Sequence, residues 1–238
     1  MNKPIRVACA ECTVRDLCLP PGLSSQEIEE VEAIVGTRRK IKRYQELFHA
    51  GDGFGSLYAI RVGSFKTRVT TQDGREQVTG FRMAGEILGL DGIGLQRHAC
   101  DAVALEDSEV CVIPFEQLEE LSREHTALQH HFHRVMSREL VNDQGLMLLL
   151  GNMRAEERLA TFLLNMSERM RARGFSPNSF VLRMSRQEIG SYLGLKLETV
   201  SRAFSRFNEM GMVEVSQREI RLKDTGALRS MVEHCTGT

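Results

Sequence analysis

Residues 115–150 read FEQLEELSREHTALQHHFHRVMSRELVNDQGLMLLL, and apolar side chains recur along this stretch at helical spacing. They fall into two stripes. The first predicts a face that packs on a domain, and it comprises Leu118, Leu121, Leu128, Phe132, Val135, Leu146 and Leu149. The second steps by four and three like the a and d positions of a heptad, and it comprises Met136, Leu140, Asp143, Met147 and Leu150. We call these five residues the seam.

The seam predicts that this helix pairs with a second copy of the chain. In a two-fold dimer Asp143 would lie near its own copy, and like-charge repulsion would weaken the pairing. An ordinary core helix with a solvated acid fits the same periodicity equally well. The segments before and after the helix must therefore decide between the two interpretations.

Length and composition favour a cytoplasmic protein with two domains. The chain has 238 residues, of which 42% are hydrophobic and 26% charged, and this is enough for two cores. It has no apolar run of membrane-spanning length, and its N-terminus lacks the apolar core of a secretory signal, so we expect no membrane partner. Residues 151–223 hold thirteen Lys and Arg against eight Glu, a net charge of +5, which leaves −6 for the rest. This imbalance favours a polyanion as the partner of the C-terminal part.

Three cysteines near the N-terminus, Cys9, Cys12 and Cys18, follow a C-x2-C-x5-C pattern. Cysteines of a cytoplasmic chain stay reduced, so ligands or redox thiols are expected rather than disulfides. Zinc usually takes its ligands as two close pairs, whereas an iron–sulfur cluster takes four thiolates, one of which can be distant. The pattern alone leaves a metal site, a redox thiol and a structural role open.

The sequence shows no catalytic constellation. No Ser-His-Asp order, glycine-rich phosphate loop or pair of carboxylates stands out, so we predict that the protein is not an enzyme. Three histidines of the helical stretch, His130, His131 and His133, are expected at exposed polar positions rather than in a metal site.

Between Lys40 and Pro114 the apolar period changes to that of strands. Short runs at residues 57–60, 65–69, 77–81 and 110–113 alternate with glycine turns, and Asp73-Gly74 is typical of a hairpin between two of them. Just before, Ser24 and Glu27 have the spacing of a capping box that opens a short helix. These patterns predict an all-β roll preceded by a helix.

The C-terminal part has the pattern of a winged helix-turn-helix. An amphipathic run over residues 155–170 is followed by a capping box at Ser185 and Glu188, a turn at Gly194 and a helix over residues 197–210. Residues 212–215 and 219–222 would form the wing hairpin. A second helix of this kind fits the major groove of double-stranded DNA.

One side of that second helix carries a polar row that could read DNA. We call it the reading row, and it comprises Lys196, Glu198, Ser201, Arg202 and Ser205. Arg202 could bond a guanine edge, Glu198 could accept from cytosine N4, and Lys196, at the N-cap, could bond a phosphate. A solvated helix face with an i,i+4 pair between Glu198 and Arg202 is the alternative.

The order of β-roll, long helix and C-terminal DNA-binding domain resembles the family of the cyclic-AMP receptor protein and the fumarate and nitrate reduction regulator. The nucleotide-binding branch has a glycine-glutamate turn and an Arg-Ser-Ala-type run, which correspond here to residues 85–90 and to Arg97-His98-Ala99. Leu90 stands where the ribose-binding acid would be, and His98 replaces the small hydroxyl. We therefore expect the nucleotide site to be lost.

The other branch carries an N-terminal cysteine cluster and one later cysteine, which corresponds to Cys111 in the run from Ser108 to Phe115. The resemblance implies that Cys9, Cys12, Cys18 and Cys111 hold a [4Fe-4S] cluster that oxygen dismantles, with Cys100 as the rival fourth ligand. It also implies that the intact Glu-x-x-Ser-Arg run at residues 198–202 reads TTGAT-type half-sites in an inverted repeat. In relatives the hairpin that matches Asp73-Gly74-Arg75 touches RNA polymerase, but Arg75 stands where an acid is seen.

The sequence therefore predicts an α+β protein with an N-terminal cyclic-nucleotide-binding-like β-roll, a long dimerisation helix and a C-terminal winged helix-turn-helix. The expected segments are a cluster-binding loop (1–22), the roll (23–115), the dimerisation helix (116–151) and the DNA-binding domain (152–238). The expected function is an oxygen-responsive transcription regulator, an activator, that binds DNA as a homodimer and contacts RNA polymerase. A regulator of the same fold gated by zinc, thiol oxidation or a small molecule is the alternative, and an electron carrier would leave the helix-turn-helix unexplained.

Overall fold

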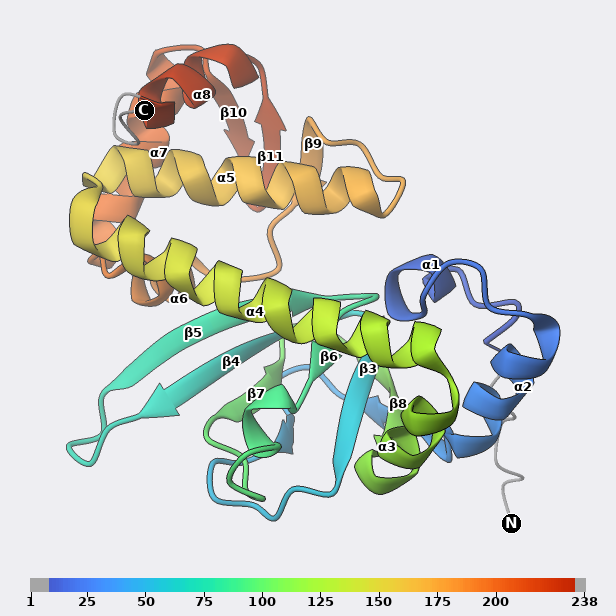
Figure 1. The fold of residues 1–238 in the computed structure, drawn as a ribbon. Coiled ribbons are helices and arrows are strands. Elements are labelled where there is room, and N and C mark those ends of the chain that lie inside the picture. Colours follow the sequence, from blue (N-terminus) through green and yellow to red (C-terminus); the bar gives the residue numbers. More distant parts are fainter. Residues whose placement is uncertain (1–8, 234–238) are drawn as a thin grey trace. The chain divides into compact units, whose positions relative to one another are not determined.

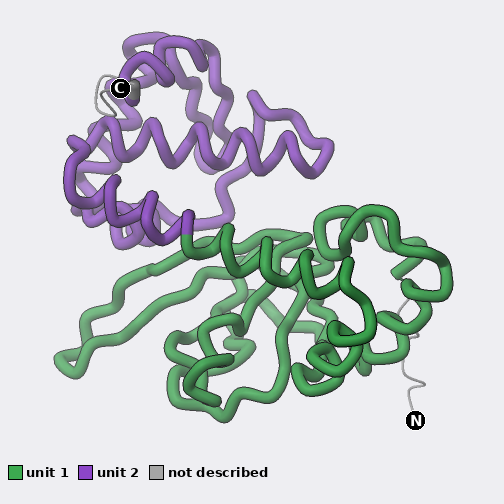
Figure 2. The backbone as a smooth tube through the Cα atoms, in the orientation of Figure 1, with its two compact units in different colours: residues 1–140 green, residues 141–238 purple. Residues whose placement is uncertain are grey.

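The computed structural model describes residues 9–233 of the chain, which form two compact units (Figures 1 and 2). The boundary between unit 1 (1–140) and unit 2 (141–238) falls inside the long helix α4 (Thr126–Asn152). No helix in the described residues is long and apolar enough to cross a membrane.

Unit 1 is built on two antiparallel sheets (Figure 1). The first has the order β1-β8-β3-β6 and the second β2-β7-β4-β5. Their bounds are β1 (Thr37–Ile41), β2 (Glu46–Phe48), β3 (Ser56–Val62), β4 (Ser64–Thr70), β5 (Glu76–Met83), β6 (Ile87–Leu88), β7 (Asp101–Ala104) and β8 (Ser108–Pro114), with a 3-10 turn η1 (Leu90–Gly92). Buried residues of both sheets, such as Ile60, Phe65 and Val110, form one core cluster. The sheets therefore pack face to face, as the roll prediction requires.

The predicted hairpin at Asp73-Gly74 is confirmed. β4 and β5 pair antiparallel up to Thr70 opposite Glu76, and Gly74 has a left-handed φ of +81° that glycine adopts without strain. The hairpin tip is braced internally, because Arg75 Nε donates to Asp73 Oδ2 at 2.7 Å.

Two helices precede the roll, α1 (Arg15–Cys18) and α2 (Ser25–Ile34). The capping box predicted for α2 is present: the backbone N–H of Glu27 donates to Ser24 Oγ at 3.2 Å, and the Glu27 carboxylate accepts from the Ser24 backbone N–H at 2.7 Å. This reciprocal pair satisfies two amide groups that the first turn of a helix leaves without partners.

The prediction of one uninterrupted helix over residues 116–151 is wrong. The chain forms α3 (Phe115–Glu124) and α4, and between them His125 has an extended backbone with φ −119° and ψ 99°. The imidazole of His125 lies between two carboxylates of α2, 2.6 Å from Glu30 Oε2 and 3.4 Å from Glu27 Oε1. These interactions hold residue 125 outside either helix. The first apolar stripe still faces inward, because Leu118, Leu128, Val135 and Leu149 are all buried.

Unit 2 contains α5 (Ala155–Ala172), α6 (Arg186–Leu193), α7 (Leu197–Glu209) and α8 (Thr225–Glu233) around a small sheet of order β10-β11-β9. β10 (Val213–Ser216) and β11 (Glu219–Leu222) form the predicted wing hairpin, and β9 (Ser179–Val181) adds a third strand that the sequence did not reveal. The apolar side of α5 is buried through Leu159, Phe162, Leu163 and Met166. The predicted α+β architecture is thus confirmed.

Candidate functional site

The N-terminal cysteines lie on a tight loop that ends in α1. The backbone N–H of Cys12 donates to the carbonyl of Cys9 at 3.1 Å, and Cys18 is the last residue of α1. Cys111 comes from the middle of β8, where it faces Arg38 of β1 on one side and Ala59 of β3 on the other. A rigid central strand thus holds the distant thiol, whereas a loop carries the three early ones.

Three of the four predicted ligand cysteines influence one another electrostatically. Burial, together with smaller contributions from the charges of Cys111, Glu32 and Cys12, raises the pKa of the Cys9 thiol to about 12, while the charge of Arg38 opposes the shift. Burial also raises the pKa of Cys111; the positive charge of Arg38 opposes the shift, and the charge of Cys12 adds to it. Cys9, Cys12 and Cys111 therefore lie within electrostatic range of one another.

An apolar environment surrounds this group. Cys9 and Cys111 pack against the buried cluster of Val31, Val35, Leu57, Leu118 and Leu128, and Leu19 packs there too. Such surroundings limit the access of water and tune the potential of an iron centre. Cys9, Cys12, Cys18, Cys100 and Cys111 are all thiols and form no disulfide. The donor set thus fits a thiolate-bound cluster by its chemistry, although no group of three metal-ligating side chains is preassembled among residues 9–233.

Cys100, the rival ligand, lies in a different environment. Its side chain is buried in the core between the two sheets, and its thiol donates to Asp91 Oδ2 at 3.5 Å. Burial raises the pKa of Cys100 to about 12, and the charge of Asp91 contributes. The shift thus arises mainly from burial in the core and from the neighbouring Asp91.

His131 was expected to be exposed like its neighbours, and this expectation is wrong. His130 and His133 are exposed, but His131 is only 8% exposed and its Nε2 lies 3.0 Å from the carbonyl oxygen of Cys18. Burial lowers the pKa of His131, and the charges of Arg138 and Arg134 lower it further. The sequence holds a signal for this burial, because His131 follows Leu128 by three positions and precedes Val135 by four, which places it on the first apolar stripe.

The run Arg97-His98-Ala99, which by resemblance corresponds to a run of the nucleotide-binding branch, contains a buried histidine. His98 is 3% exposed, and its ring stacks on Phe48 with the centroids 3.7 Å apart and an interplanar angle of 10°. The edge of Phe54 packs against the same ring, and Asp91 Oδ1 lies 3.7 Å from Nδ1. The expected loss of the nucleotide site is therefore in keeping with the packing of His98.

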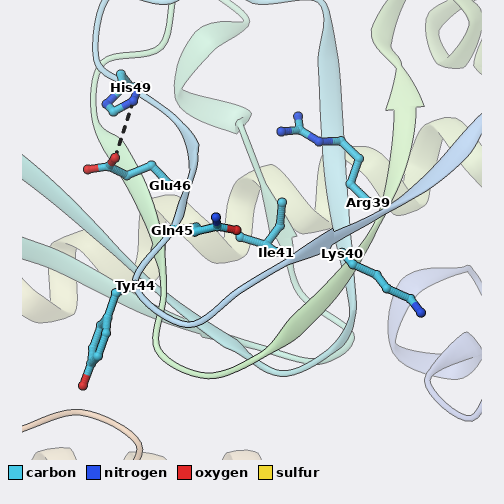
Figure 3. Close-up of a pocket in the computed structure, with 7 residues that line it drawn as sticks. All are labelled: Arg39, Lys40, Ile41, Tyr44, Gln45, Glu46 and His49. Atoms are coloured by element: carbon cyan, nitrogen blue, oxygen red, sulfur yellow. Dashed lines mark ion pairs between the residues drawn. The ribbon is translucent and has the colours of Figure 1, made fainter.

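A separate hollow of about 600 Å³ lies beside β1 and β2 (Figure 3). It is lined by Arg39, Lys40, Ile41, Tyr44, Gln45, Glu46 and His49. His49 pairs with Glu46 at 3.5 Å, and Tyr44 points away from that pair (Figure 3).

In unit 2 a capping box and two glycines shape α6 and the turn that leads from it to α7. The capping box of α6 is present, since Glu188 N donates to Ser185 Oγ at 3.2 Å and Ser185 N to the Glu188 carboxylate at 2.7 Å. Gly194 ends α6 in the left-handed conformation, with φ +63°. A Cβ on Gly190 would lie 2.6 Å from the carbonyl oxygen of Leu195, so only glycine allows the turn to approach the helix this closely.

The inner side of α7 is anchored, and its outer side is open. Val200, Phe204 and Phe207 are buried, and the guanidinium of Arg186 stacks on Phe204 at 3.3 Å from the ring centroid. Burial lowers the pKa of Arg186 to about 10. This contact joins α6 to α7, and no local spacing of residues predicts it.

All five residues of the reading row are exposed. No ion pair between Glu198 and Arg202 is present in the described part of the chain, so the row is available to a ligand rather than neutralised within the helix. Lys196 occupies the N-cap of α7 with an extended backbone and makes no side-chain cap, which leaves its ammonium group to reach outward.

The seam on α4 is largely uncovered in the single chain. Leu140 and Met147 are 64% and 65% exposed, Asp143 is exposed between them, and Met136 and Leu150 are half-buried. Leu140 and Met147 stand seven residues apart, so they lie on the same side of the helix and leave apolar surface uncovered there.

Comparison with known proteins agrees with this geometry. The cyclic nucleotide-binding domain matches residues 38–125, and the Crp-like helix-turn-helix domain matches residues 157–231. The transcriptional regulatory protein btr of Bordetella pertussis is 44% identical over 229 residues, which cover 96% of this chain and 95% of that protein. The chain belongs to the CRP/FNR family of transcription regulators.

Further members support this assignment. The fumarate and nitrate reduction regulatory protein of Escherichia coli K12 is 43% identical over 228 residues, covering 96% of this chain and 91% of that protein. FixK2 from Bradyrhizobium japonicum has a solved structure with a TM-score of 0.76 and 30% identity, covering 82% of this chain and 96% of its own. As a CRP/FNR regulator the protein controls transcription and binds DNA, and it is not an enzyme. Membership also supports formation of a dimer.

Proposed function

We propose that this CRP/FNR regulator responds to oxygen through a [4Fe-4S] cluster held by Cys9, Cys12, Cys18 and Cys111. The proposal rests chiefly on one observation: the thiols of Cys9, Cys12 and Cys111 lie within electrostatic range of one another beside an apolar cluster. Four thiolates in apolar surroundings suit an iron–sulfur cluster better than a structural zinc, whose ligands usually come as two close pairs. When bound, the cluster supplies an oxygen-labile connection between the loop and β8.

The seam would convert that connection into dimerisation. Leu140 and Met147 offer the apolar surface, and Asp143 places a carboxylate between them. With the loop fastened to β8, α4 would be held in an arrangement that tolerates the repulsion between two Asp143 carboxylates. With the loop released, the repulsion would favour monomers, which bind half of a palindrome poorly.

The reading row would then bind TTGAT-type half-sites in an inverted repeat. Arg202 would donate two hydrogen bonds to guanine, Glu198 would accept from cytosine, and Lys196 would pair with a phosphate. Ser201 and Ser205 lie on the same exposed face and would complete the contact. Such a regulator would act in the cytoplasm, where its DNA is.

A contact with RNA polymerase would follow from the β4–β5 hairpin. Its tip carries Asp73 and Arg75, which pair with each other at 2.7 Å. Because Arg75 is engaged by Asp73, the tip presents little net charge, and we expect this contact to rest on shape and hydrogen bonds more than on charge. Transcription from a promoter with an intact inverted repeat, measured for Asp73→Ala against wild type, would test the contact, and we expect activation to fall while DNA binding stays unchanged.

The test of the cluster is anaerobic purification of the full chain. We expect a brown protein with iron and acid-labile sulfide in equal amounts, whose visible absorption fades on exposure to air while its dimers dissociate. A colourless protein that contains zinc, with the same DNA binding in air, would replace the proposal by a regulator gated by zinc or thiol oxidation. Gel shifts with an inverted repeat and a scrambled repeat complete the test, because an electron carrier would bind neither.

A further inference from the structure

His131 makes a contact that the proposed function does not yet use. Its ring is buried on α4, and Nε2 lies 3.0 Å from the carbonyl oxygen of Cys18. A carbonyl oxygen can only accept, so Nε2 must carry the proton and donate it. The contact therefore joins α4 directly to the backbone of one proposed cluster ligand.

The accepting carbonyl lies at the C-terminal end of α1, whose last residue is Cys18. A hydrogen bond from another element makes the position of such a carbonyl depend on that element. The Cys18 backbone and α4 thus share one part-buried hydrogen bond.

Other anchors hold the loop to different elements. The backbone N–H of Ala10 donates to Glu32 Oε1 on α2 at 2.8 Å. Leu17 packs on the turn between β5 and β6 so closely that a Cβ on Gly85 would lie 2.6 Å from the Leu17 Cβ. These contacts fix the loop to α2 and the roll, whereas the contact of His131 reaches the helix that carries the seam.

His131 lies close to the seam along α4. Met136, the first residue of the seam, follows His131 by about one and a half helical turns. Val135, one turn after His131, is buried, so this part of the helix is held firmly. A displacement of the Cys18 carbonyl would therefore act on α4 just before the seam begins.

We propose that the hydrogen bond from His131 to the Cys18 carbonyl is the link through which the state of the cysteine loop sets the position of α4 and thereby dimerisation. His131 is a positioning residue in this scheme and touches no iron. The inference rests on the proposed function and adds a residue to it that is not a cysteine and not part of the seam.

The experiment compares the full-length wild type with His131→Leu, His131→Gln and His130→Leu. Leucine fills the space without a donor, glutamine places its amide nitrogen near the position of the histidine Nε2, and His130 is the exposed neighbour that serves as the matched control. For each protein, iron and acid-labile sulfide are counted after anaerobic reconstitution. The dimer dissociation constant is then measured by sedimentation with and without the cluster, and the ratio of the two constants is the coupling.

We expect His131→Leu to bind the same iron and sulfide as wild type while its coupling falls by about 3- to 10-fold, the worth of one hydrogen bond. His131→Gln should restore the coupling, and His130→Leu should leave it unchanged. A purely structural role would change the unfolding midpoint without changing this ratio. Full coupling in His131→Leu, or no recovery in His131→Gln, would overturn the proposal.

A second measurement covers the case in which the leucine variant reconstitutes poorly. Amide hydrogen exchange of residues 9–19 in the cluster-free proteins should be faster in His131→Leu than in wild type and His131→Gln, and equal rates would overturn the link. Other outcomes would refute the proposed function itself. These are a wild-type protein that binds no iron, or one whose dimer dissociation constant is the same with and without the cluster.

Discussion

Cys9 and Cys111 stand far apart in the sequence, yet both pack on one apolar cluster and the charge of Cys111 raises the pKa of Cys9. Two thiols that repel each other's ionisation in a buried place are costly to ionise together. A cationic iron centre reverses that cost, because thiolates are the form that binds metal. Under the proposed function, this arrangement lets a strand cysteine bind the same centre as the N-terminal loop.

Cys111→Ser should abolish cluster assembly, whereas Cys100→Ser should preserve it. The thiol of Cys111 lies with Cys9 and Cys12, but that of Cys100 is engaged by Asp91 in the core between the sheets. Iron and acid-labile sulfide, counted after anaerobic reconstitution, measure the difference. Cluster loss in the Cys100 variant alone, with Cys111→Ser intact, would reassign the fourth ligand.

Arg202→Ala should relax the preference for guanine at one position of each half-site, at a cost of about 1–3 kcal/mol in binding free energy. The side chain is exposed on α7 and is not consumed by an ion pair with Glu198. Binding to a series of inverted repeats with single substitutions measures the preference. An unchanged preference would place the reading head elsewhere.

Lys196→Ala tests the expected contact with a DNA phosphate, a contact that does not depend on the base sequence. Since Lys196 stands at the N-cap of α7 with its side chain free of a cap bond, we expect affinity to fall about equally for all sequences and the salt dependence to become weaker by about one ion. Sequence-selective loss in this variant would contradict the phosphate role.

Features encoded over a few residues could be predicted from the sequence. The capping boxes that begin at Ser24 and Ser185, the turn at Gly194 and the buried side of α7 all appear where local spacing placed them. Each depends on backbone groups three or four positions apart, which a sequence displays directly. Cys111, by contrast, is predicted only by the family resemblance, because no spacing rule distinguishes it from Cys100.

Features that depend on distant partners could not be predicted. The break at His125 depends on Glu27 and Glu30, which come from a helix far earlier in the chain. The hydrogen-bond partner of His131 is the Cys18 carbonyl, which comes from the N-terminal loop, and β9 pairs with β11 through Phe180 opposite Ile220. Periodicity records which face of a helix is apolar, but not which polar side chain another segment will cover.

The capping box of α2 predicts a dependence on pH. Hydrogen bonds from the Ser24 backbone and then from its hydroxyl lower the pKa of Glu27 below its ordinary value of 4.5, and His125 contributes. A folded-state pKa below the unfolded one means that the carboxylate stabilises the fold above that unfolded value. The stabilisation is lost as the pH falls through the folded pKa.

Glu27→Gln should therefore lower the thermal unfolding midpoint of the cluster-free protein at about pH 7. The difference from wild type should shrink with acidification and vanish below the folded pKa of Glu27. Glu29→Gln, at an exposed neighbouring position, is the control and should follow wild type throughout. A constant difference across the acidic range would show that the carboxylate charge plays no part.

Asp143→Ala should make dimers and DNA binding persist in air. The carboxylate is exposed between Leu140 and Met147, so a paired seam would bring two like charges together. Removing about 1–2 kcal/mol of repulsion would tighten the cluster-free dimer by about 5- to 30-fold. Sedimentation and gel shifts before and after exposure to air measure the effect, with Asn142→Ala, also exposed, as the control. Air sensitivity equal to that of wild type in the Asp143 variant would remove the seam from the mechanism and leave the cysteines to act on DNA binding by another route.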